Sequence, residues 1–167
     1  NVLAMNYEAD AWWPGGHLQT IGAALWARRT AGPAPRYRRE RWATPDADFV
    51  DVDWLVPAAP SVTGHAGTAR TTTLVLFHGL EGSSRSHYAE SFAAYAAERG
   101  WSYAVPHFRG CSGELNHAPR AYHSGDFVEI GWMLGQVRAR IDRAGGGRLL
   151  AVGVSLGGNA LLRWAGE

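Results

Sequence analysis

The chain has 167 residues, of which 46% are hydrophobic and 19% are charged. This length fits one ordinary domain, and the composition is typical of a globular protein and not of a disordered one. The formal net charge of +1 is too small to indicate a nucleic-acid partner, and the single cysteine, Cys111, excludes an internal disulfide framework.

Residues 1–35 are predicted to form an aromatic, glycine-rich segment and a short helix from about Leu18 to Arg28. Breaker residues fill positions 30–35 and separate this part from residues 36–167. The Trp12-Trp13 pair is expected to pack against the domain, with a place in the lining of an acyl pocket as the alternative.

Two strands are predicted between Tyr37 and Val56, around a turn at residues 45–48. In the second strand Val50, Val52 and Trp54 alternate with Phe49, Asp51 and Asp53, which is the period of a strand with two different faces. We expect both strands to form an antiparallel edge of a larger sheet. The nearby arginine cluster is interpreted as a solvated edge strand and not as an anion site; its members are Arg36, Arg38, Arg39 and Arg41.

From residue 72 onward the pattern alternates between short apolar runs and amphipathic stretches. The apolar runs predict buried strands, and the stretches between them predict helices. Strand–helix–strand repetition is typical of parallel βαβ units, so we predict an α/β fold with a mostly parallel sheet. The strands are expected at Thr72–Phe77, Trp101–Pro106 and Arg148–Val154, and the helices at His87–Glu98 (with Tyr88, Phe92, Tyr95 and Ala96 on its apolar face), Asp126–Arg143 (capped by Asp126, with Phe127, Ile130, Met133, Leu134, Val137 and Ile141 as its apolar stripe) and Leu156–Trp164.

Ser155 is the leading candidate for a catalytic nucleophile. It lies in Gly153-Val154-Ser155-Leu156-Gly157, between a predicted buried strand and a predicted helix. A sharp strand-to-helix turn projects the serine hydroxyl above the sheet, and the flanking glycines leave room for that turn. The helix N-terminus beside it supplies free N–H groups and a positive dipole end, which favour a developing oxyanion. The alternative is a glycine-rich packing turn with an inert serine.

A second motif, His78-Gly79-Leu80, ends the earlier buried strand. Acyl transfer needs two donors for the oxyanion, and we predict the backbone N–H groups of Leu156 and Leu80. Gly79 would let the backbone approach a substrate, and both Gly79 and His78 are candidates for substrate contact. For His78 we favour packing under the loop, with a hydrogen bond to the backbone, over a role as catalytic base.

Other polar residues on the predicted loops are weaker candidates. His107, His117 and His123 match no ordinary zinc spacing, so loop capping is favoured over a metal site. Arg109 and Glu114 are candidates for an ion pair that braces the loop. Cys111 follows no strained turn and is expected to be packed and unreactive.

The order of these motifs resembles that of the YheT-like branch of the α/β-hydrolase superfamily, an esterase group that includes the plant embryogenesis-associated hydrolases. The blocks that carry the resemblance are Gly15–Thr20, His78–Ser83, Phe108–Gly113, Tyr122–Gly125 and Gly153–Asn159. The resemblance implies an α/β-hydrolase fold, with Ser155 as the nucleophile for short-chain esters or monoacylglycerols, without a metal or cofactor.

One departure from this fold concerns the rest of the triad. In α/β-hydrolases the order along the chain is Ser, then acid, then His, whereas residues 156–167 contain no histidine. We therefore expect an N-terminal fragment or a truncated gene product, with an incomplete sheet at its C-terminus and little esterase activity of its own. A non-catalytic binding module, or an acyltransferase that uses the same serine, remains an alternative.

Features outside the motifs predict the setting of the protein. No apolar run reaches the roughly 18 residues of a membrane span, and the N-terminus lacks the pattern of a signal peptide. With one cysteine, these features predict a cytoplasmic protein in a reducing compartment. The family resemblance implies a small-molecule or lipid ester as its partner. The oligomeric state cannot be predicted.

Overall fold

The structure, a computed structural model, describes residues 33–57 and 71–167. The predicted helix from Leu18 to Arg28, the Trp12-Trp13 pair and almost all of the predicted 1–35 segment lie outside the described residues.

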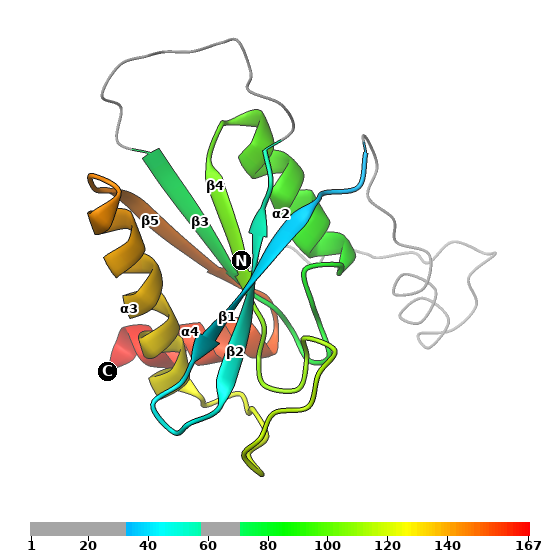
Figure 1. Ribbon diagram of the computed structural model, residues 1–167, viewed down its shortest axis with the longest axis vertical. Coiled ribbons are helices and arrows are strands. Elements are labelled where there is room, and N and C mark those ends of the chain that lie inside the picture. Colours follow the sequence, from blue (N-terminus) through cyan, green and yellow to red (C-terminus); the bar gives the residue numbers. More distant parts are fainter. Residues whose placement is uncertain (1–32, 58–70) are drawn as a thin grey trace, which may run out of the picture. The chain divides into compact units, whose positions relative to one another are not determined.

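A single five-stranded sheet organises the described part of the chain (Figure 1). Its strands are β1 (Tyr37–Ala43), β2 (Phe49–Leu55), β3 (Thr71–Phe77), β4 (Ser102–Pro106) and β5 (Gly147–Gly153), in the spatial order β1-β2-β4-β3-β5. β2 is antiparallel to both β1 and β4, whereas β3 is parallel to both β4 and β5. Only β2 therefore runs against the other strands, and the predicted mostly parallel sheet with an antiparallel N-terminal edge is confirmed.

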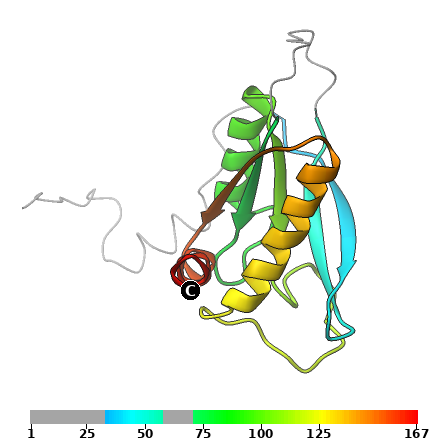
Figure 2. The ribbon, with the colours of Figure 1, turned by 90° about the vertical axis from the view of Figure 1, so that its left-hand side faces the viewer.

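Helices cover both faces of this sheet (Figure 2). They are α2 (His87–Glu98), α3 (Phe127–Arg143) and α4 (Leu156–Gly166). Because side chains alternate along a strand, β3 contributes to two cores. Leu74 and Leu76 pack in the core with α2, whereas Val75 and Phe77 pack in the core with α3 and α4. A strand buried on both faces needs a continuous apolar run, which explains the sequence of β3.

The predicted helix faces are only partly correct. On α3 the stripe is confirmed from Ile130 onward, since Ile130, Met133, Leu134, Val137 and Ile141 are all buried, whereas Phe127 is only half-buried. On α2 the buried residues are Ala89, Ala93 and Ala96, whose small side chains let the helix lie close to the sheet. Tyr95, predicted on the buried face, is 44% exposed, and Arg99 stacks over its ring at 3.5 Å.

The predicted cap of α3 is also wrong in its contacts. Asp126 occupies the N-cap position, but its side chain makes no capping hydrogen bond. Its carboxylate instead pairs with Arg120, from the loop that precedes the helix. The helix start is therefore held by an ion pair between side chains.

The strand order places a topological switch point beside β3. The chain passes from β3 to β4 on one side and later returns to β5 on the other side. In open α/β sheets, the loops that follow the two strands at such a point diverge and leave a crevice at their carboxyl ends. Phe77 and Gly153 are register partners at those ends, so the loops that begin at His78 and Val154 start side by side.

Candidate active site

Ser155 occupies the sharp turn between β5 and α4. Its backbone has φ of 51° and ψ of −114°, and its side chain is exposed. A non-glycine residue at positive φ carries strain of about 1–3 kcal/mol, which persists only where the surroundings impose it. The predicted strained turn is present, and it presents the hydroxyl at the carboxyl edge of the sheet.

The glycines around Ser155 are required by close backbone contacts. A Cβ atom on Gly157 would lie 2.4 Å from the carbonyl oxygen of Phe77, and one on Gly153 would lie 2.5 Å from the Cα of Gly158. These distances are shorter than any van der Waals contact, so a side chain fits at neither position. Gly157 thus brings the start of α4 directly against the end of β3, and Gly153 brings it against the end of β5.

Both predicted oxyanion donors lie near Ser155, Leu156 as its neighbour in the chain and Leu80 on a loop next to it in space. Leu156 is the first residue of α4, where backbone N–H groups have no partner within the helix. Leu80 lies in the loop after β3, and a Cβ on the neighbouring Gly79 would be 3.4 Å from the Cβ of Ser155. Within the described residues, neither the Leu80 nor the Leu156 amide donates a hydrogen bond.

His78 lies beneath this loop and is fully buried. Its Nδ1 lies 2.8 Å from the carbonyl oxygen of Gly79, and its Nε2 accepts the N–H of Phe108 at 3.1 Å. This pair of contacts requires a neutral ring with its proton on Nδ1. Burial lowers the pKa of His78 to about 4, which also favours the neutral ring. The favoured packing role fits this geometry, whereas direct contact of the ring with a substrate is excluded by its burial.

Two tyrosines that the sequence analysis did not single out as site residues hold the same loop. The hydroxyl of Tyr88 accepts the N–H of Gly79 at 3.0 Å, and the hydroxyl of Tyr122 accepts the N–H of Glu81 at 3.0 Å. Tyr88 was predicted only as part of the apolar face of α2, and Tyr122 only as part of a family block. No local pattern marks a hydroxyl that binds a backbone group elsewhere in the fold.

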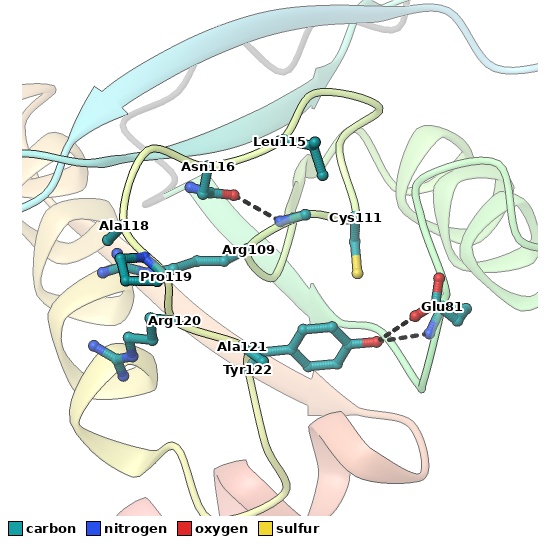
Figure 3. A pocket seen from close by; sticks show the side chains of 11 residues that line it. Glu81, Arg109, Cys111, Leu115, Asn116, Ala118, Pro119, Arg120, Ala121 and Tyr122 are labelled. Carbon is teal, nitrogen blue, oxygen red and sulfur yellow. Dashed lines mark hydrogen bonds between the residues drawn. The ribbon is translucent and has the colours of Figure 1, made fainter.

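A cavity of about 460 Å³ opens beside Tyr122 and Glu81, next to this loop (Figure 3). The segment from Arg109 to Ala121 forms its other walls, and Cys111 and Leu115 contribute apolar groups. Cys111 is half-buried, and burial raises the pKa of its thiol, which disfavours the nucleophilic thiolate. The cavity is therefore a candidate binding pocket with an unreactive thiol in its wall.

Arg109 anchors this segment from below. Its guanidinium binds Asp46 at 2.8 Å, Asp48 at 2.9 Å and Glu129 at 2.7 Å, and only 5% of the residue is exposed. The prediction of an ion pair between Arg109 and Glu114 is therefore wrong, since Glu114 pairs with Arg41. Arg109 instead connects the β1–β2 turn to the start of α3.

The arginines of β1 are ion-paired more than the prediction of a solvated edge suggests. Arg41 binds Asp51 at 2.8 Å, and Arg39 binds Asp53 at 2.7 Å. Asp53 also accepts hydrogen bonds from Ser84 and His107. Burial alone would raise the pKa of Asp53, but these hydrogen bonds lower it overall. His107 thus belongs to a buried polar cluster, while the backbone of His117 donates to Asp48.

Within the described residues, the hydroxyl of Ser155 has no hydrogen-bond partner. Neither a histidine nor a carboxylate in residues 33–57 or 71–167 hydrogen-bonds its hydroxyl, and the same residues contain no cluster of three metal-ligating side chains. None of the helices described is long and apolar enough to span a membrane.

A mostly parallel α/β sheet with a strained serine after β5 and a glycine loop after β3 is typical of the α/β-hydrolase class. A sequence model of the α/β hydrolase fold family matches residues 72–167, and the chain belongs to this family. Within it, the chain is 42% identical over 145 residues to YheT of Escherichia coli (strain K12), which is named as an inferred esterase. The match covers 87% of this chain and 39% of that protein, and it confirms the predicted resemblance.

Two more distant relatives are an embryogenesis-associated protein from a plant and a monoacylglycerol lipase from a fish. The embryogenesis-associated protein EMB8 of Picea glauca is 27% identical over 152 residues, which cover 90% of this chain and 32% of that one. Monoacylglycerol lipase ABHD2 of Danio rerio is 28% identical over 170 residues, which cover 99% and 38%. The chain thus spans between 32% and 39% of the length of these three relatives.

The solved structure of the Pyrococcus furiosus esterase Pf2001 has the same fold. It superposes with a TM-score of 0.55 at 16% identity, over 81% of this chain and 50% of that one. At this identity the likeness concerns the fold alone.

Proposed function

We propose that this chain carries the nucleophile and the oxyanion-binding groups of a serine hydrolase of carboxylic esters. The observation that carries the proposal is the strained backbone of Ser155, which holds an exposed hydroxyl at the switch point of the sheet. Strain at such a place is retained where the geometry is needed for chemistry. The names of the relatives, which include esterases and lipases, support a hydrolase of esters.

The proposed reaction is acyl transfer through a covalent intermediate. The Oγ of Ser155 attacks the ester carbonyl and loses its proton to a general base, and the carbonyl oxygen becomes an oxyanion. The amides of Leu80 and Leu156 donate to that oxyanion, and the positive end of α4 favours its charge. Collapse of the intermediate releases the alcohol, which takes the proton, and leaves an acyl ester on Ser155. Water then hydrolyses this ester and restores the serine.

The base and its acid are proposed to come from sequence outside residues 1–167. The triad of this fold places them after the nucleophile, and the described histidines are held in other contacts, as for His78 and His107. We therefore propose that residues 1–167 alone hydrolyse esters slowly or not at all.

The proposed substrates are short-chain carboxylic esters or monoacylglycerols, with the cavity beside Tyr122 as a place for part of the substrate. The name of the ABHD2 relative supports the second class. A non-catalytic binding module and an acyltransferase on the same serine are the competing proposals. The cytoplasmic location remains a prediction from the sequence.

The test has two parts. A fluorophosphonate probe should label the complete protein that carries this chain, and Ser155→Ala should abolish both labelling and hydrolysis of p-nitrophenyl acetate. Ser91→Ala, an exposed serine on α2, is the matched control and should leave both unchanged. An unlabelled protein that still binds ester analogues would favour the binding module. Transfer of the acyl group to added alcohol in preference to water would favour the acyltransferase.

A further inference from the structure

The loop after β3 contains a tight turn at Gly79–Gly82. The N–H of Gly82 donates to the carbonyl oxygen of Gly79 at 3.0 Å, which closes the turn, and Leu80 and Glu81 are its two central residues. Glu81 has φ of 53°, a conformation that usually requires glycine at this position of a turn. A glutamate is therefore held in a strained conformation next to the proposed oxyanion donor.

Tyr88 holds the turn on one side. Its hydroxyl accepts the N–H of Gly79, and a Cβ on Gly82 would lie 2.3 Å from this same oxygen. The absence of a side chain at Gly82 therefore makes room for the tyrosine hydroxyl. The ring of Tyr88 packs against the core under α2, so the oxygen is fixed by a rigid ring.

Tyr122 holds the turn on the other side (Figure 3). Its hydroxyl accepts the N–H of Glu81 and donates to the Glu81 carboxylate at 3.2 Å, so both ends of the strained residue are engaged. The ring stacks on Phe108 at 5.3 Å with an interplanar angle of 9°. Burial raises the pKa of Tyr122 to about 12, so the hydroxyl keeps its proton at neutral pH and can serve both contacts.

These contacts leave a single amide of the turn without an acceptor in the described residues. The N–H groups of Gly79, Glu81 and Gly82 are all engaged, and that of Leu80, between the two tyrosine contacts, is not. A donor that stabilises an oxyanion must be fixed in place before the charge develops, because reorientation during the reaction would consume the gain.

We propose that Tyr88 and Tyr122 are positioning residues, whose hydroxyls fix the Gly79–Gly82 turn so that the Leu80 amide points at the oxyanion. The inference rests on the proposed function, since it assigns the Leu80 amide to that reaction. Neither tyrosine is proposed to touch the reacting atoms. Both act through the backbone on either side of Leu80.

The test removes each hydroxyl and keeps each ring, in the complete protein that carries this chain. Tyr88→Phe and Tyr122→Phe should each lower kcat for a short-chain p-nitrophenyl ester about tenfold, with KM within about twofold of the original, since loss of a whole oxyanion donor costs about a hundredfold or more. The Ki of a trifluoromethyl ketone, which forms a tetrahedral adduct with the serine, should rise by about the same factor as kcat falls. Tyr95→Phe, on the outside of α2, is the control and should change neither value.

Each outcome decides between a positioning and a merely structural role. Variants that lose thermal stability but keep kcat and Ki at 25 °C overturn the inference, and so does an equal loss of kcat in Tyr95→Phe. If one of the two variants fails to fold, the other gives the same readout. An original protein without serine-dependent turnover overturns the proposed function together with the inference, whereas an active protein with unaffected tyrosine variants overturns the inference alone.

Discussion

The close contact between Gly157 and the end of β3 predicts that an added side chain at this position lowers the free energy of unfolding. In Gly157→Ala, the new Cβ would lie 2.4 Å from the carbonyl oxygen of Phe77 and 2.5 Å from that of His78. Both are backbone atoms of a buried segment, so about 1 Å of movement must come from the sheet or the helix. Overpacking of this kind costs about 1–3 kcal/mol or more, against a gain of at most about 1 kcal/mol in helix propensity. We expect a net loss of about 1–2 kcal/mol in the free energy of unfolding.

Gly135 provides the matched control for this substitution. It also lies in a helix, but it is exposed on α3, and a Cβ there would meet no atom within 4 Å. Gly135→Ala should therefore raise the free energy of unfolding by about 0.5–1 kcal/mol. Urea unfolding followed by circular dichroism measures both variants. If Gly157→Ala were as stable as Gly135→Ala, the close packing of α4 on β3 would be refuted.

Three further substitutions test the buried and strained groups. The folded-state pKa of His78, about 4, lies below the ordinary 6.5, so the unfolded chain binds the proton at higher pH than the folded chain. The free energy of unfolding should therefore fall by about 3 kcal/mol as the pH drops from 6.5 to 4. Urea titrations at stepped pH measure this slope, and His78→Asn should flatten it. Arg109→Ala leaves three carboxylates without their cation and should lower the free energy of unfolding by about 3–5 kcal/mol. The control Arg138→Ala, in an exposed ion pair, should lower it by less than about 0.5 kcal/mol. Equal losses in urea unfolding would contradict the burial of Arg109. Ser155→Gly removes the strain of positive φ and should raise the melting temperature by a value that corresponds to about 1 kcal/mol, while Ser155→Ala, which keeps the strain, should not.

The sequence predicts the fold well because its signals are local. The apolar run of β3 and the alternation in β2 each depend on nearby residues, and the structure places the corresponding elements within one or two residues of expectation. On α2 only Tyr95 was misplaced, because the alanines and the aromatic residues form two adjacent stripes that both have helical spacing. Helical periodicity cannot indicate which stripe faces the sheet when small side chains allow closer packing.

The candidate site could be predicted only where a short sequence motif identifies both the chemical group and its place between two elements. The strained turn at Ser155 follows from a motif between a strand and a helix, and the glycines around it follow from the same motif. The partners of Arg109 and Tyr122 lie 20 or more residues away in the chain, and the contact of Tyr88 with Gly79 joins α2 to the preceding loop. An arginine that binds the β1–β2 turn and α3 looks, in the sequence, the same as one that pairs with a nearby glutamate such as Glu114.

The pairing of β3 with β5 also determines when the candidate site can exist during folding. Thr71 pairs with Gly147 and Phe77 with Gly153, so the Ser155 turn and the Leu80 turn meet only after a long loop has closed. Contacts of such sequence separation form late, because the entropy of loop closure opposes them until other packing is in place. A chain that has formed only β1 to β4 holds the Leu80 turn without its serine. The Ser155 turn and the Leu80 turn therefore come together only when β5 docks on β3, the last of these strands in chain order.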